Sequence, residues 1–349
     1  MKPYLKLKNA RRLLIRSTNW IGDAVMTTPA VRMIRKNFPD AEITILAKPW
    51  VAPVFENSSH ADHVMIYDSS GRHHGVIGKF RLARDLEARY FDAAILLQNA
   101  FEAALISFLA GIPVRIGYDT DARRFLLTHP VPCTPEIKRV HQTEYYTDIL
   151  RGIGLRPCNG ELYMKVSREN QCRAGETLRQ YGISQQGRLL GINPGATFGT
   201  AKRWFPERYA ALCKKLADAA PNILIFGGPG EEALGKHISE IIGKHCISLC
   251  GKTTLGEAIA LIEKCSLFIT NDSGLMHVAA ALDVPQAAIF GSTDHVTTSP
   301  ASAKSRIVRV PTPCSPCLRP ECPEKHHQCM KAVTVDMVYE ACQKLIIDN

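Results

Sequence analysis

Residues 12–25 read RLLIRSTNWIGDAV and lead from a short apolar strand into a helix. Arg12–Arg16 is typical of a buried parallel strand, and Ala24–Lys36 has helical periodicity with Pro29 as its one flaw. In an open α/β sheet such a junction lies at the carboxyl edge of the strands, where ligands bind. Asp23 stands at this junction. Its carboxylate therefore serves either as a catalytic group or as a cap for the helix N-terminus.

Short β-type segments alternate with helical segments from one end of the chain to the other. In the first half the expected strands are Leu13–Arg16, Glu42–Ala47, His63–Tyr67, Asp92–Leu97 and Ile112–Tyr118. In the second half they are Leu189–Asn193, Asn222–Phe226, Ile247–Leu249, Leu267–Thr270 and Ala287–Phe290. This alternation predicts parallel sheets that are covered by helices on both faces.

Two such series predict two doubly wound α/β domains that face each other across a cleft. We place an N-terminal domain at residues 1–170, a second domain at 171–333 and a C-terminal helix at 334–349. Residues 120–166 are expected to be irregular, because they contain prolines and the polar run His141-Gln142-Thr143-Glu144.

The composition is that of a globular protein with an anionic partner. Of 349 residues, 46% are hydrophobic and 22% are charged, and no apolar run reaches the roughly 18–20 residues that span a bilayer. The N-terminus lacks the apolar core of a secretory signal, so we expect a cytosolic protein. The net charge of +10 favours an acidic membrane surface or a phosphorylated ligand. Nucleic acid is the least favoured partner, because no nucleic-acid-binding motif accompanies the basic residues.

A strand-to-helix turn in the second half suits a diphosphate. The predicted strand Leu267–Thr270 runs into Asn271-Asp272-Ser273-Gly274, and the helix that follows carries His277 in its first turn. Free backbone N–H groups and the positive end of the helix dipole favour anions at such a site. A well-capped helix with Asp272 or Ser273 as its cap is the alternative.

Two further loops in the second half also follow predicted strands. Residues 193–204 combine glycines and hydroxyls with Lys202, which suits phosphate oxygens, although the P-loop spacing is absent. Residues 227–232 end in Glu231 and Glu232. Either carboxylate accepts hydrogen bonds from ribose hydroxyls or simply suits a first helical turn. This loop lacks the G-x-G-x-x-G pattern, which argues against a hydride-transfer enzyme.

Phosphate-type loops in one domain and Asp23 in the other indicate glycosyl transfer from a sugar nucleotide. The attacking hydroxyl needs a base, and the departing diphosphate needs positive charge and backbone donors. A base on one domain and leaving-group stabilisation on the other favour inversion at the anomeric carbon. The rival interpretation is a two-domain protein that binds a sugar or nucleotide without catalysis.

At these residues the chain resembles the lipopolysaccharide heptosyltransferases of glycosyltransferase family 9, which have the GT-B fold. The resemblance covers most of the chain and rests on Gly22-Asp23, Asn193-Pro194-Gly195 with Lys202, Gly227-Gly228-Pro229-Gly230-Glu231, and Asp272-Ser273-Gly274 with His277. The form Trp20-Ile21-Gly22-Asp23 is more similar to heptosyltransferase II than to heptosyltransferase I.

The resemblance implies an inverting transfer of L-glycero-D-manno-heptose from ADP-heptose to a heptosyl-Kdo2-lipid A core. It also implies a cytoplasmic enzyme in peripheral contact with the cytosolic face of the inner membrane. A family 9 transferase with a different acceptor or sugar nucleotide is the alternative.

The resemblance also implies roles for individual residues. Asp23 would be the base, Lys202 would hold the diphosphate together with Thr197, and Glu231 would bind ribose. The diphosphate–sugar site would be lined by Asp272, Ser273, Gly274 and His277. Phe198 stands where a relative has a second hydroxyl, so that contact is not expected. An anionic acceptor and acidic lipids would attract basic side chains in the first domain, for which the candidates are Arg123, Arg124 and Lys138.

Four of the twelve cysteines cluster near the C-terminal end, namely Cys314, Cys317, Cys322 and Cys329. With His326 and His327 beside the last of them, they offer enough soft ligands for a structural zinc ion or an iron–sulfur cluster. Reduced thiols without a metal are the alternative. No cofactor is expected to be required for catalysis, since Lys202 and backbone N–H groups already supply positive charge to the leaving group.

Overall fold

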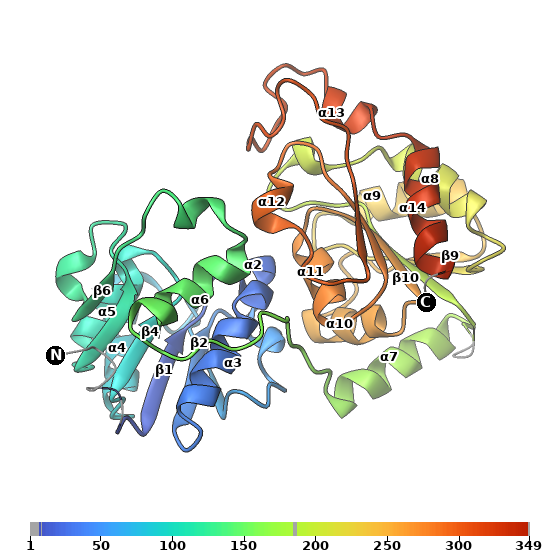
Figure 1. Cartoon of the computed structure of the whole chain (residues 1–349). Coiled ribbons are helices and arrows are strands. Elements are labelled where there is room, and N and C mark those ends of the chain that lie inside the picture. Colours follow the sequence, from blue (N-terminus) through green and yellow to red (C-terminus); the bar gives the residue numbers. More distant parts are fainter. Residues whose placement is uncertain (1–6, 8, 184–186, 348–349) are drawn as a thin grey trace. The chain divides into compact units, whose positions relative to one another are not determined.

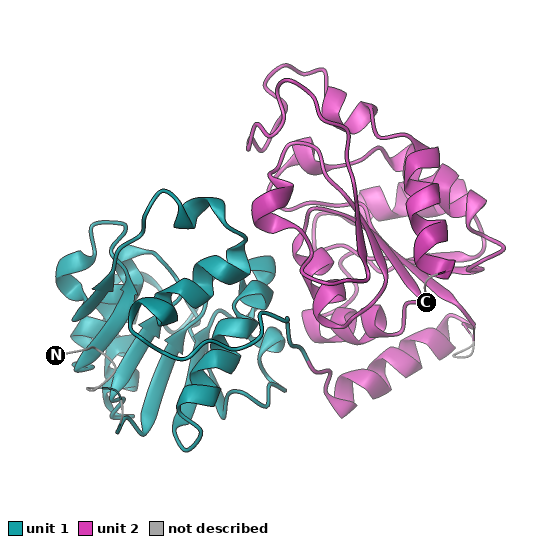
Figure 2. Cartoon of the chain, in the orientation of Figure 1, with its two compact units in different colours: residues 1–164 teal, residues 165–349 magenta. Residues whose placement is uncertain are grey.

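The computed structural model describes residue 7 and residues 9–183 and 187–347. The chain divides into two compact units, residues 1–164 and 165–349, which Figure 2 colours separately. The expected boundary at residue 170 falls inside helix α7 (Arg168–Gln180), which packs against α10 (Leu255–Glu263) of the second unit. Helix α14 (Val335–Ile347) packs against α8 (Pro206–Lys215), so the expected separate segment 334–349 joins the second unit as well.

The first unit contains a six-stranded parallel sheet in the order β3-β2-β1-β4-β5-β6. Its strands are β1 (Arg12–Arg16), β2 (Glu42–Ala47), β3 (His63–Ile66), β4 (Ala93–Leu96), β5 (Val114–Tyr118) and β6 (His129–Val131). Leu13, Leu14 and Ile15 of the central strand β1 are buried almost completely, because helices cover both faces of the sheet.

Helices and short 3₁₀ segments surround this sheet (Figure 1). They are α2 (Ile21–Met26), α3 (Thr28–Asn37), η1 (Ala52–Val54), α4 (Gly75–Glu87), α5 (Phe101–Leu109), η2 (Arg124–Leu126), η3 (Ile137–Arg139) and α6 (Gln142–Gly152). Helix α3 packs against α6, and α4 packs against α5. The crossovers from β1 to β2 and from β3 to β4 run in opposite directions across the sheet, so right-handed connections place α3 and α4 on opposite faces.

The second unit contains another six-stranded parallel sheet, in the order β12-β11-β10-β7-β8-β9. Its strands are β7 (Leu189–Asn193), β8 (Asn222–Ile225), β9 (Cys246–Ser248), β10 (Leu267–Asn271), β11 (Gln286–Ile289) and β12 (Ser305–Val308). Its other helical segments are η4 (Thr200–Lys202), α9 (Glu232–Ile242), α11 (Gly274–Ala281), α12 (His295–Thr298) and α13 (Gln328–Lys331). With β7 in the place of β1, the strand order is that of the first unit, and two doubly wound sheets confirm the predicted α/β class.

Three features differ from the elements that the sequence predicts. Strands β6 and β12 extend the two sheets beyond the expected five strands each. Helix α6 lies within residues 120–166, which were expected to be irregular. The expected helix Ala24–Lys36 is two helices, α2 and α3, that meet at Thr27. Pro29 lies in the first turn of α3, where its missing N–H breaks no helical hydrogen bond.

Candidate active site

Asp23 lies in the first turn of α2, at the carboxyl edge of the first sheet, and is half-buried. The N-cap residue of this helix is Trp20, whose side chain makes no capping hydrogen bond. Asp23 is therefore not the N-cap residue of α2, although a carboxylate in a first turn interacts favourably with the helix dipole. A carboxylate at this edge has the chemistry of a proton acceptor.

Tyr146, on α6, donates its hydroxyl hydrogen to Asp23 Oδ1 over 3.2 Å. Burial and the neighbouring charge of Asp23 raise the pKa of Tyr146 well above its usual value, so the phenol stays protonated as a donor. Tyr146 thus orients the carboxylate. This residue was not predicted, because residues 120–166 were expected to be irregular. The helical spacing of the buried residues Tyr146, Ile149 and Leu150 was the available signal.

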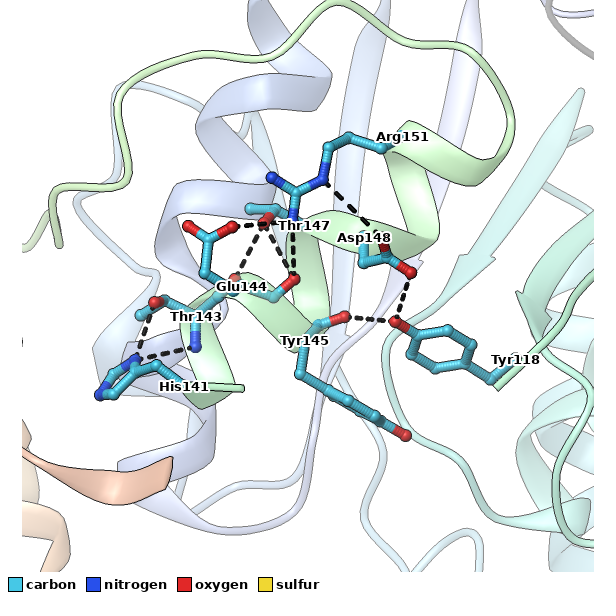
Figure 3. A network of polar contacts seen from close by, with 8 residues as sticks. All are labelled: Tyr118, His141, Thr143, Glu144, Tyr145, Thr147, Asp148 and Arg151. Carbon is cyan, nitrogen blue, oxygen red and sulfur yellow. Dashed lines mark hydrogen bonds and ion pairs between the residues drawn. The ribbon is translucent and has the colours of Figure 1, made fainter. Parts of the chain in front are cut away.

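Helix α6 is itself held by a network of polar contacts, which Figure 3 shows. At its start, Nδ1 of His141 accepts a hydrogen bond from the backbone N–H of Thr143 over 3.3 Å. The buried Tyr118, at the end of β5, donates to the carbonyl oxygen of Tyr145 over 2.7 Å and lies 3.1 Å from Oδ2 of Asp148. These contacts tie α6 to the sheet that carries Asp23.

In the second unit, the three predicted loops follow β7, β8 and β10, which are neighbours in the sheet. The loops after β7 and β10 are joined by side chains. Nδ2 of Asn193 donates to Oγ of Ser273 over 2.7 Å, and Nδ2 of Asn271 donates to the carbonyl oxygen of Pro194 over 2.7 Å. The structure therefore brings the predicted donor-binding loops of this unit together at one edge.

Lys202, in η4, forms an ion pair with Asp272, in which Nζ lies 2.8 Å from Oδ2. Both side chains are largely buried. The same Nζ lies 5.0 Å from the centre of the Phe198 ring, and Thr197 is exposed in the preceding loop. The ion pair places the ammonium group of Lys202 beside the N-terminus of α11, so an anion bound there would contact both the ammonium group and the helix N-terminus.

Glu231 lies near the end of the loop that follows β8 and approaches the loop that follows β7. Its Oε2 accepts a hydrogen bond from the backbone N–H of Gly228 over 2.9 Å, and its Oε1 lies 3.8 Å from a guanidinium nitrogen of Arg203. A Cβ atom at Gly195 would lie only 1.9 Å from Oε1 of Glu231, so a larger residue there would displace the Glu231 carboxylate from this position. Arg203 is a second cation at this edge that the sequence analysis did not assign to the site. Its position directly after Lys202 was the available signal.

Helix α11 begins at Gly274 with Ser273 as its N-cap residue. The Ser273 side chain makes no capping hydrogen bond and instead accepts from Asn193. His277 lies in the first turn and is 97% buried, since only 3% of it is exposed. The first N–H groups of the helix have no intrahelical partners, which suits a negatively charged ligand.

The basic residues that were expected to bind the acceptor have different environments. Arg123 is fully buried, and its Nε donates to the carbonyl oxygen of Tyr118 over 2.9 Å. This arginine ties strand ends together instead of presenting a charge to a ligand. Arg124 forms an exposed ion pair with Asp119 at 2.9 Å, and Lys138 is exposed in η3.

The four clustered cysteines line one small cavity of about 20 Å³ together with His326 and His327. Within residues 7, 9–183 and 187–347, no three His, Cys, Asp or Glu side chains are arranged to hold a metal ion as they stand. The zinc or iron–sulfur centre therefore stays a prediction. The same segment supports η4, because the backbone N–H of Ala201 donates to the carbonyl oxygen of Pro320 over 3.0 Å.

The sequence profile of glycosyltransferase family 9 (heptosyltransferase) matches residues 79–328 of this chain. The chain belongs to glycosyltransferase family 9. Membership makes it a glycosyltransferase and confirms the resemblance that the loop motifs indicated.

This family 9 transferase is 30% identical to lipopolysaccharide heptosyltransferase 2 of Escherichia coli K12, over 97% of this chain and 99% of the relative. Lipooligosaccharide heptosyltransferase 2 of Haemophilus influenzae is 29% identical, over 85% of this chain and 88% of the relative. The solved structure of E. coli ADP-heptose lipopolysaccharide heptosyltransferase II superposes with a TM-score of 0.82 at 29% identity, over 97% of this chain and 99% of that one. The similarity over both units confirms the predicted GT-B fold class.

Proposed function

We propose that this transferase moves L-glycero-D-manno-heptose from ADP-heptose to the heptosyl-Kdo2-lipid A inner core of lipopolysaccharide. The observation that carries the proposal is the similarity to heptosyltransferase II, which extends over nearly the full length of both chains. Similarity in both units favours the same donor and acceptor over another sugar nucleotide or another acceptor.

In the proposed reaction, Asp23 accepts the proton of the acceptor hydroxyl while the hydroxyl oxygen attacks the anomeric carbon of the heptose. The bond from that carbon to the ADP oxygen breaks on the opposite side, so the configuration inverts. ADP leaves with the electron pair. Lys202 and the N–H groups at the start of α11 stabilise its negative charge, and this assignment requires no cofactor.

The remaining donor-binding residues are assigned by their positions in the loops. We assign the hydroxyl of Thr197 to the diphosphate, because Thr197 is exposed on the loop that leads to Lys202. Glu231 is assigned to the ribose hydroxyls. Asp272 pairs with Lys202 before the donor binds, and the diphosphate then shares this cation. The diphosphate–sugar site is completed by Ser273, Gly274 and His277.

The proposal is tested by incubating the purified protein with ADP-heptose and defined truncated cores and measuring product mass. We expect one added heptose on a core that already carries a first heptose, and none on Kdo2-lipid A alone. Transfer only to Kdo2-lipid A, or only from another sugar nucleotide, would identify a different family 9 activity. Binding of ADP-heptose with no product on any core would support the non-catalytic alternative.

We further propose peripheral contact with the cytosolic face of the inner membrane, supported by helix α5. Its Ala103, Ala104 and Ile106 face the core, whereas Phe101 and Phe108 are 40% and 49% exposed. An apolar helix is normally buried all round, so the exposed stripe is suited to a lipid surface. Within the described residues, no helix is long and apolar enough to cross a membrane.

Helix α4, which packs against α5, adds to this apolar surface and supplies positive charge. Val76, Ile77 and Phe80 are 71%, 70% and 53% exposed. Arg81 and Arg84 are exposed on the same helix. Exposed apolar side chains interspersed with cations are typical of surfaces that bind anionic lipids.

The membrane part is tested by sedimentation with vesicles of phosphatidylglycerol and of phosphatidylcholine. We expect preferential binding to the anionic vesicles, weakened by the double substitution Ile77→Ser and Phe80→Ser. The matched control is Val296→Ser in the second unit, where the side chain is 56% exposed. Equal binding by the double variant and the control would contradict this surface.

A further inference from the structure

The carboxyl ends of β1, β2 and β3 carry a buried cluster of polar side chains that the proposed reaction does not use. Arg16 is the last residue of β1, and Lys48 and Tyr67 directly follow β2 and β3. Their exposed fractions are 3%, 7% and 1%, respectively. Because these strands are neighbours, the three side chains meet at the edge of the sheet that also carries Asp23.

Lys48 is the unusual member of this cluster. Its Nζ lies 3.5 Å from the centre of the Tyr67 ring, which is a cation–π contact. No carboxylate in the described part of the chain forms an ion pair with it, although buried lysines are normally paired. The nearby Glu102 accepts a hydrogen bond from the Tyr67 hydroxyl over 2.7 Å and forms an ion pair with Lys79 at 2.6 Å. Its carboxylate is thus committed to other partners.

Arg16 adds a second buried cation beside Lys48. Its guanidinium donates to Oδ1 of Asn19 over 2.8 Å and to the carbonyl oxygens of Ser17 and Leu46. The centre of the guanidinium lies 5.4 Å from the Tyr67 ring centre. These acceptors are neutral and position Arg16, and the charge of a nearby carboxylate, Glu102, favours the protonated form of the guanidinium.

The electrostatics of the cluster favour the binding of an anion. Burial, followed by the charge of Arg16, lowers the pKa of Lys48 to about 8. Burial lowers the pKa of Arg16 to about 10. Arg16, Lys48 and Lys79 lie near Glu102, and Asp68 is a second carboxylate whose charge acts on Lys48. A bound anion would offset the unfavourable desolvation of these charges.

We propose that Arg16 and Lys48 form a binding site for a carboxylate or phosphate group of the acceptor. This inference rests on the proposed function, in which the acceptor is an anionic saccharide that reacts beside Asp23. Lys48 contributes N–H donors to the anion, and Arg16 contributes mainly its charge. The candidate donor-binding loops are all in the second unit, so this cluster in the first unit is assigned to the acceptor rather than to ADP-heptose.

The test compares Lys48→Met and Lys48→Arg with the control Lys36→Met, which removes an exposed lysine at the end of α3. Lys48→Met should raise the KM for the acceptor by about 10- to 100-fold, with the KM for ADP-heptose unchanged. Lys48→Arg should recover part of this loss because it keeps the charge. An acceptor KM for Lys48→Met that is no higher than that of Lys36→Met overturns the proposal.

Modified acceptors identify which anion binds. One lacks the lipid A phosphates, and in the other the Kdo carboxylates are converted to methyl esters. The effect of Lys48→Met should disappear on the acceptor that lacks the group bound by Lys48, because the two changes remove the same interaction. An undiminished effect on both modified acceptors overturns the site.

A direct binding measurement separates this inference from the proposed function. If the wild-type protein transfers heptose to no core, the proposed function has failed, and the anion site is still measurable by titrating free Kdo and inorganic phosphate in a calorimeter. Binding of either probe by the wild type and Lys36→Met, but not by Lys48→Met, supports the site. Equal binding by all three proteins, or none by the wild type, overturns it.

Discussion

The two sheets have the same strand order but very different chemistry at their carboxyl edges. In the second unit the charges are paired within the protein, as in Lys202 with Asp272 and Arg203 with Glu231. In the first unit, Asp23 is oriented by the neutral Tyr146, and the buried Lys48 has no carboxylate partner among the described residues. The edge of the second unit is thus balanced by ion pairs within the protein, whereas the edge of the first unit carries the buried Lys48, to which we assign an anionic ligand.

The largest loss of turnover is expected when the proposed base, Asp23, is replaced. Asp23→Asn keeps the size of the side chain but removes the proton acceptor, so kcat should fall by about 10²- to 10⁴-fold. Binding of ADP-heptose, measured by calorimetry, should be unchanged. Asp40→Asn, at an exposed position of the same unit, is the control. Unchanged turnover by Asp23→Asn would refute its role as base.

The edge of the second unit is tested by removing the ion pair between Lys202 and Asp272. Lys202→Met should weaken ADP binding by about 10- to 100-fold, because a charge-assisted contact to the diphosphate is lost. It should also lower Tm, since Asp272 is left buried without a partner. The double variant Lys202→Met with Asp272→Asn should recover Tm but not ADP affinity. Lys214→Met, an exposed lysine of the same unit, should change neither.

Lys48, at the edge of the first unit, predicts that the KM for the acceptor depends on pH. The pKa of Lys48 is about 8, so the fraction that is protonated falls by about tenfold for each pH unit well above that value. Because only protonated Lys48 binds an anion, the acceptor KM should rise as the pH increases beyond 8. The groups that influence Lys48 are Arg16, Tyr67, Lys79, Glu102 and Asp68. Lys48→Arg should move the rise to higher pH, and a profile identical to that of the wild type would contradict the assignment.

A smaller effect is expected when the base loses its hydrogen-bond donor. Tyr146→Phe preserves packing but removes the donor to Asp23, so kcat should fall by about 3- to 10-fold. Because the hydrogen bond from Tyr146 favours the ionised carboxylate, the acidic limb of the kcat–pH profile should move to higher pH in the variant. Tyr339→Phe, in the second unit, is the control. An unshifted acidic limb would show that Tyr146 has only a packing role.

The smallest expected effect on turnover concerns the cysteine segment that supports η4. We expect about one zinc or iron centre per chain by elemental analysis, since four thiols and two imidazoles border one small cavity. Removing the metal or introducing Cys317→Ser should lower Tm and raise the KM for ADP-heptose several-fold, because the contact between Pro320 and Ala201 would loosen. Cys172→Ser, at an exposed position, is the control. Absence of stoichiometric zinc and iron would refute the metal centre.

The sequence predicted most of the architecture because its signals are local. Buried parallel strands have continuous apolar runs, and the loops after them contain glycine, hydroxyl and charged residues. Helix α6 escaped prediction because its polar start, His141 to Glu144, resembles a loop until the cap at His141 is seen. Tyr146 could not be assigned to the site because its partner, Asp23, is 123 residues away in the chain.

The sequence by itself determined the two doubly wound sheets, the position of Asp23 after the first strand and the three candidate donor-binding loops. Tertiary structure decided which charges compensate one another. Lys202 and Lys48 are both lysines after parallel strands, yet one meets Asp272 and the other meets the ring of Tyr67. Likewise, Arg123 proved to be a buried tie between strand ends. The physical reason is that the state of a buried charge depends on burial and on partners from distant segments, which residue type and local spacing do not specify.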